Sequence, residues 1–206
     1  LPIDFELSAV SSGTDSDTIS INITPLTNIA AALTLDKVAG GTAPAAAAES
    51  SNYQIADLLG LDGDVTELPI VDLTDADAIN GADADALNAN LKSAAVVEAA
   101  LNGSPDGTSL EDALGDFVAQ YVDSGGIAET EGGDVETSSV SLEEIAAASQ
   151  SLATAMVNEL EGVNAEDENI AAVQTALNNE ETAAAAGSTD PVQGDVPDDF
   201  GSEGLR

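Results

Sequence analysis

The amino-acid sequence predicts a mainly α protein with a small β component (α+β): an N-terminal β-hairpin packed on a bundle of about five or six helices, with an extended C-terminal tail. Apolar and polar residues alternate over 1–24, as in half-buried strands. Over 25–186, apolar residues recur at helical spacing between N-cap residues and glycines. Residues 187–206 are rich in Gly, Asp and Pro, a composition typical of an extended tail. We therefore expect a hairpin at 1–24, an Ala-rich acidic helical domain at 25–186 and a tail at 187–206.

The hairpin prediction rests on two alternating runs. PIDFELSAV at 2–10 and TISINI at 18–23 each place apolar residues on one face, and the segment SSGTDSD between them is rich in turn-forming residues. A two-stranded hairpin is marginal alone in water, so it needs a packed helix or a further strand. The first strand could therefore pair with the sheet of a second copy of the chain.

A helix is expected to begin directly after the second strand. Thr24 is a suitable N-cap, and Pro25 fits the first helical position, where its missing N–H costs nothing. Gly40 and Gly41 are expected to end this helix. A second, Ala-rich helix is predicted from Pro44 to Gly60.

The rest of the chain is predicted to be helical with acidic loops. Residues 64–73 form a loop or at best an edge strand, because they contain Pro69. One helix is expected over about 75–101, weakened by Gly81. Capping-box patterns, Thr108 with Glu111 and Ser141 with Glu144, open two further helices. A last helix is expected over about 166–186.

Charge and composition exclude several functions. The 206 residues include 39 Asp and Glu against 3 Lys and Arg, for a net charge of -36. A chain with this charge repels nucleic acid and anionic membranes, and no apolar run is long enough for membrane insertion. With no His and no Cys, the commonest general base and the usual zinc ligands are absent. We therefore expect a protein that is not an enzyme, and a hydrolase using paired carboxylates is disfavoured.

Calcium is the one cofactor that the sequence suggests. Candidate ligands are Asp62, Asp64, Asp75 and Asp77, which lie in acidic stretches. An EF-hand frame starting at Asp75 fails, because its fifth position is Ile79 and its twelfth is Ala86. A solvated acidic surface that requires no bound ion is the alternative explanation.

The run INITPLTNIAAAL resembles a junction in secreted bacterial cell-surface proteins and lipoproteins, where a β-segment passes through Thr-Pro-Leu-Thr into an Ala-rich helical domain. The matching residues here are Thr24, Pro25, Leu26 and Thr27. The resemblance extends loosely over the Ala-rich helices to about residue 160. Such proteins are non-enzymatic in appearance, so the resemblance implies an extracellular or cell-surface location more than an activity. The start at Leu1 instead of Met is expected of a processed mature chain, or of a chain trimmed at its N-terminus, from which any signal peptide is already missing.

These observations predict an extracellular structural subunit that self-assembles into a filament or surface layer through its N-terminal strand and C-terminal tail. Its partners would be copies of itself. The predicted assembly residues are Ile3, Phe5, Leu7, Ile19, Ile21, Ile23, Val196 and Phe200. The alternative is a calcium-responsive adhesion or binding module of a larger surface protein.

Overall fold

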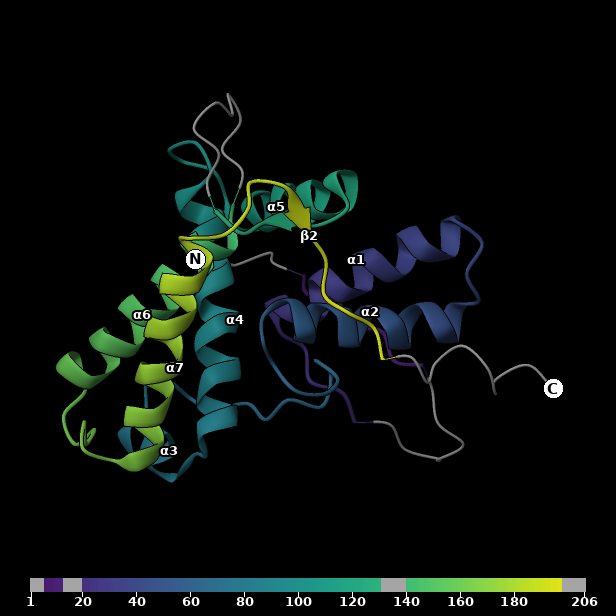
Figure 1. Cartoon of the computed structure of the whole chain (residues 1–206). Helices are drawn as coiled ribbons and strands as arrows, with labels where there is room; N and C mark the ends of the chain where they lie inside the picture. Colours follow the sequence, from purple (N-terminus) through teal and green to yellow (C-terminus); the bar gives the residue numbers. More distant parts are fainter. Residues whose placement is uncertain (1–5, 13–19, 131–139, 198–206) are drawn as a thin grey trace.

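The computed structural model describes residues 6–12, 20–130 and 140–197, and within them the chain is mainly helical, with seven α-helices and one two-stranded sheet (Figure 1). The helices are α1 (Pro25–Ala39), α2 (Pro44–Leu58), α3 (Ala76–Gly81), α4 (Ala84–Asn102), α5 (Leu110–Ser124), α6 (Leu142–Glu159) and α7 (Glu168–Ala184). The strands are β1 (Ile127–Ala128) and β2 (Pro191–Val192).

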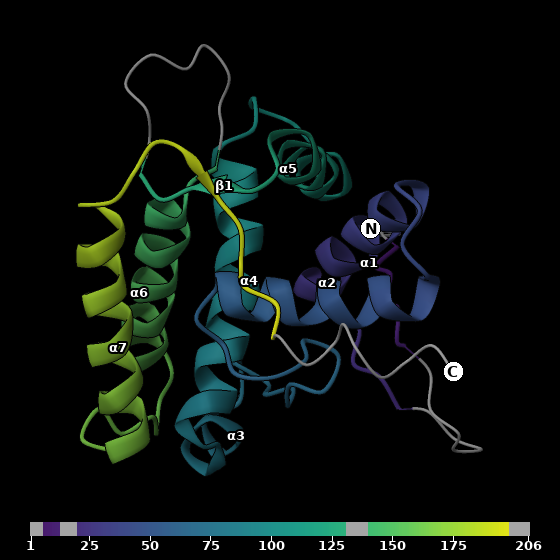
Figure 2. The same cartoon turned by 45° about the vertical axis from the view of Figure 1, so that its right-hand side comes forward.

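Two hydrophobic clusters hold the helices together, and α4 contributes to both. The larger cluster contains residues of α1, α2 and α5, the beginning of α6, and Ala89 with the C-terminal half of α4. The smaller one joins α3, α7, the N-terminal half of α4 and the end of α6. In Figures 1 and 2, α4, α6 and α7 stand side by side, and the pair α1 and α2 lies on the other side of α4. Many of the buried contacts are made by Ala, which allows close helix packing.

Two of the predicted helix starts are confirmed in detail. Thr24 caps α1 in a reciprocal arrangement: the Thr27 N–H donates to Thr24 Oγ1 (3.3 Å), and the Thr24 N–H donates to Thr27 Oγ1 (2.9 Å). Ser141 and Glu144 form the same type of capping box at the start of α6. These motifs depend on residues within one turn, so the local sequence suffices to predict them.

Two other helix predictions were wrong in their bounds. The expected single helix over 75–101 is two helices, because Ala82 is extended and Asp83 accepts the Ala86 N–H (2.8 Å) to start α4 anew. The helix after residue 107 is capped by Ser109 and not by Thr108, since Ser109 Oγ accepts the Asp112 N–H.

The N-terminal hairpin is a wrong prediction, because neither 6–12 nor 20–24 is a strand. Asparagine side chains of the helices take the backbone groups that a strand partner would take. Asn28 Oδ1 accepts the Ser8 N–H (3.1 Å), and Asn52 Nδ2 donates to the Val10 carbonyl (3.0 Å). The one sheet of the described chain is formed later, where β1 pairs with β2 in the antiparallel register Ile127 with Val192. Residues 64–73 form a loop, one of the two forms predicted.

Residues 187–197, which we call the strap, are extended and lie against the body of the molecule. In Figure 2 the strap leaves the top of α7, passes β1 and descends across α2. It approaches the backbone closely at two glycines. A Cβ at Gly194 would lie 1.8 Å from the Gln54 carbonyl oxygen, and one at Gly126 would lie 2.2 Å from the Val192 carbonyl oxygen. Side chains larger than hydrogen therefore do not fit at either position.

A chain of polar contacts through Gln54 attaches the strap to α1, α2 and α5. Lys37 Nζ donates to Gln54 Oε1 (2.8 Å), and Gln54 Nε2 donates to Gln193 Oε1 (3.1 Å). Gln193 Nε2 in turn donates to the Gly125 carbonyl at the end of α5. Burial lowers the pKa of Lys37.

Candidate functional site

The predicted assembly residues are placed differently from one another. Leu7 is half-buried and packs against the larger hydrophobic cluster, and Ile21 is half-buried as well. Ile23 and Val196 are exposed, by 54% and 36%. The remaining predicted assembly residues lie outside the described residues: Ile3, Phe5, Ile19 and Phe200. The structure thus places two apolar assembly candidates on the surface.

Ile23 is held outward by the residues on either side of it. The Asn22 N–H donates to the Thr66 carbonyl (2.9 Å), and Asn22 Nδ2 donates to the Leu68 carbonyl (2.6 Å). Thr24, next in the chain, already caps α1. The segment 20–23 therefore lies beside the loop at 66–68, which leads to a second exposed apolar residue, Ile70 (61% exposed).

Val196 follows the point where the strap is fixed on α2. The Asp195 N–H donates to Asp57 Oδ2 (2.7 Å), directly after the close approach of Gly194. Val196 then lines a shallow hollow of 490 Å³ with Tyr53 and Leu61, among other residues. Its position is set by the strap and not by a strand partner.

The predicted calcium ligands do not come together as one site. Asp62 and Asp64 line a hollow of 340 Å³, whereas Asp75 lies directly before α3 and Asp77 lies in its first turn. Asp64 already has hydrogen-bond donors two residues away, because its Oδ1 accepts from both the backbone N–H and the hydroxyl of Thr66. Asp75 caps α3. Within the described ranges, no three acidic side chains are close enough together to hold a metal ion.

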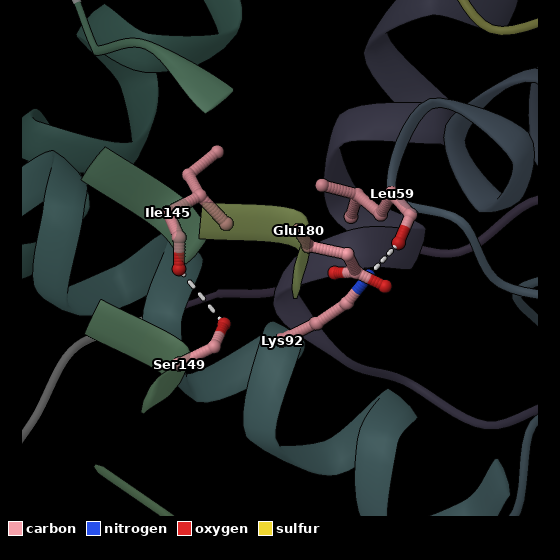
Figure 3. A network of polar contacts seen from close by, with 5 residues as sticks. All are labelled: Leu59, Lys92, Ile145, Ser149 and Glu180. Atoms are coloured by element: carbon pink, nitrogen blue, oxygen red, sulfur yellow. Dashed lines mark hydrogen bonds and ion pairs between the residues drawn. The ribbon is translucent and has the colours of Figure 1, made fainter. Parts of the chain in front are cut away.

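Sequence reasoning missed a cavity around Lys92. This lysine lies on α4 and is only 4% exposed, and its ammonium forms an ion pair with Glu180 Oε2 of α7 (2.5 Å). Figure 3 shows Glu180 meeting Lys92 and the contact of Lys92 Nζ with the Leu59 carbonyl. Burial lowers the pKa of Lys92, and Glu180 opposes that shift. Helical spacing was a usable signal, because Lys92 shares a face with the buried Val96 and Ala99.

The local fold explains why the Leu59 carbonyl is available to Lys92. After α2 the Leu61 N–H donates to the Ala56 carbonyl and the Gly60 N–H to the Asp57 carbonyl, with Gly60 at φ +63°. This is a Schellman motif, which satisfies two of the last carbonyls of the helix. Lys92 Nζ donates to the carbonyl of Leu59, the C-cap residue of α2, where a cation also interacts favourably with the helix dipole.

The cavity beside this ion pair has a volume of 320 Å³ and lies between α2, α4, α6 and α7. Leucine, isoleucine and alanine side chains form most of its wall, including Leu142, Ile145 and Ala146 of α6. Its ionisable groups are Lys92 and three carboxylates, Asp57, Glu129 and Glu180. Ser149 also lines it, but its hydroxyl donates to the Ile145 carbonyl (2.8 Å; Figure 3). The wall of the cavity thus combines apolar side chains with charged groups that can bind a ligand.

Comparison with known protein families, curated proteins and solved structures finds no match, so the function has to be inferred from the chain's own residues. Among the described helices, none combines the length and apolarity needed to cross a bilayer.

Proposed function

We propose that this chain is an extracellular, non-enzymatic structural subunit that associates with copies of itself through a surface that includes Ile23 and Val196. The observation that carries the proposal is the exposure of Ile23 and Val196, two predicted assembly residues, on a molecule with a net charge of -36. Large apolar side chains on so acidic a surface gain from being covered by a second copy.

Because the chain is so acidic, this association should require an environment of high ionic strength. Two copies of this charge repel each other strongly in dilute buffer, and salt shortens the range of that repulsion to about 8 Å at physiological ionic strength. Seawater or another saline exterior would therefore permit contacts between apolar residues that dilute buffer prevents. This agrees with the extracellular location that the resemblance at Thr24 to Thr27 implies.

A surface-specific substitution tests the proposal. Light scattering after size-exclusion chromatography in seawater-like salt should show species larger than a single chain for the unsubstituted protein. The double variant Ile23→Ser, Val196→Ser should form fewer of these larger species. Leu35→Ser is the matched control, because Leu35 is exposed (69%) but lies on α1, outside the predicted assembly set. Equal masses for all three proteins would contradict the proposed surface.

A further inference from the structure

We propose that the Lys92 cavity binds a small organic ammonium ion with an aliphatic body. This inference is independent of self-assembly, because the cavity contains none of the assembly residues. It begins from the volume of 320 Å³, which lies within the range of small-molecule sites.

The charges lining the cavity favour a cation. Lys92 is matched by Glu180, so Asp57 and Glu129 remain without a cationic partner among the described residues. The net charge of the lining is thus -2, from three carboxylates and one ammonium. An anionic ligand would be repelled by these groups and by the acidic molecule as a whole.

Both unmatched carboxylates are held by backbone N–H groups of the strap. Glu129 Oε2 accepts the Ser188 N–H (2.8 Å), and Asp57 Oδ2 accepts the Asp195 N–H (2.7 Å). Those donors are neutral, and each bond uses one oxygen of the carboxylate, so the second oxygen remains to accept from a ligand. The strap therefore fixes two carboxylates of the cavity wall, each of which can accept a hydrogen bond from an ammonium group.

The apolar wall selects an organic cation over an inorganic one. Leu142, Ile145 and Ala146 would contact an alkyl chain, whereas a hydrated metal ion gains nothing from them. In the part of the chain that the structure describes, no three acidic side chains are arranged to replace the water shell of a metal ion. Figure 3 shows that Ile145 and the Lys92–Glu180 pair come from neighbouring helices of this region.

Calorimetric titration of the full chain with n-hexylammonium chloride tests this site, with ammonium chloride and sodium hexanoate as reference ligands. We expect saturable binding of one hexylammonium per chain and none of the two reference ions. Glu129→Gln should weaken binding about tenfold, as expected for loss of one charge-assisted hydrogen bond. Ala146→Leu should abolish it by filling the cavity without changing the charge.

Matched controls separate the cavity from the acidic surface. Glu166→Gln removes an exposed carboxylate and Ala172→Leu adds an exposed apolar side chain on α7, and neither residue lines the cavity, so both should leave the affinity unchanged. Equal weakening by Glu129→Gln and Glu166→Gln would show general attraction to the surface and overturn the proposal. Preferential binding of hexanoate would overturn it too. Glu129→Gln keeps the test decisive if Ala146→Leu does not fold.

Discussion

Gly194 is the residue at which the strap comes closest to the body of the molecule. A Cβ there would lie 1.8 Å from the Gln54 carbonyl oxygen and 2.6 Å from the Leu58 backbone nitrogen, and neither backbone atom can rotate away. Gly194→Ala should therefore displace the strap and lower the free energy of unfolding by about 1–3 kcal/mol, as overpacking does.

Chemical denaturation, together with limited proteolysis of the strap, measures this effect. Gly115→Ala is the control, because it lies within α5 with no atom near its would-be Cβ. That substitution should stabilise the protein by about 0.5–1 kcal/mol. A strap that stays protected from protease in Gly194→Ala would refute the close approach.

The buried Tyr121 should make the free energy of unfolding depend on pH. Burial raises the pKa of Tyr121 to about 12 from an ordinary value of 10.0, and Gln54 opposes part of the shift. Between these values the unfolded chain has lost the phenol proton while the folded chain keeps it, so the free energy of unfolding falls as the pH rises. The slope from one such proton is at most about 1.4 kcal/mol per pH unit.

Urea unfolding at several pH values in this window checks the sign. Tyr121→Phe should have a shallower fall in stability than the unsubstituted chain. Tyr53→Phe should change the slope less, because Tyr53 is less buried and its pKa is raised mainly by partial desolvation and then by nearby carboxylates. Identical slopes for the unsubstituted chain and Tyr121→Phe would show that Tyr121 titrates normally.

At the scale of elements, the junction before α1 is stabilised by its capping box. Thr24→Ala removes the Oγ1 that accepts the Thr27 N–H, and should lower the free energy of unfolding by about 1 kcal/mol. Thr42→Ala, an exposed threonine before α2 whose side chain caps no helix, should change it little. Thermal and urea unfolding of both variants compare them directly, and equal losses would contradict a capping role.

Elements whose signals are local could be predicted from the sequence. Thr24, Pro25, Ser141 and Glu144 mark helix starts through contacts within one turn. The hairpin could not be judged locally, because an alternating run becomes a strand only when another strand takes its backbone groups. Here Asn28 and Asn52 of the helices bond to the segment at 8–10 instead.

The candidate site was harder to predict, because it depends on contacts between distant parts of the chain. Lys92 and Glu180 are far apart in sequence and meet only when α4 and α7 pack together. The composition of residues 187–206 predicted an extended tail. Attachment of the strap to the body of the molecule depends on Gly194, which fits closely against α2. Single-sequence patterns contain no direct signal for either contact.

At the scale of the whole molecule, mutual repulsion of carboxylates should make stability depend on salt. The free energy of unfolding should rise with sodium chloride, as the Debye length falls from about 30 Å at 0.01 M to about 3 Å at 1 M. Calcium and magnesium should stabilise equally at matched concentration, because no three-carboxylate site is found within the described residues. Thermal unfolding in each salt measures this, and a saturable gain with calcium alone would favour the adhesion-module alternative.

The proposed self-assembly also belongs to the scale of the whole molecule, and its most direct measurement is the mass of the intact chain in solution. Light scattering over a wide range of protein concentration, in seawater-like salt, should give a mass that rises above the 20.5 kDa of a single chain as concentration increases. A constant 20.5 kDa at every concentration and salt would contradict the proposal that this protein is a self-associating structural subunit.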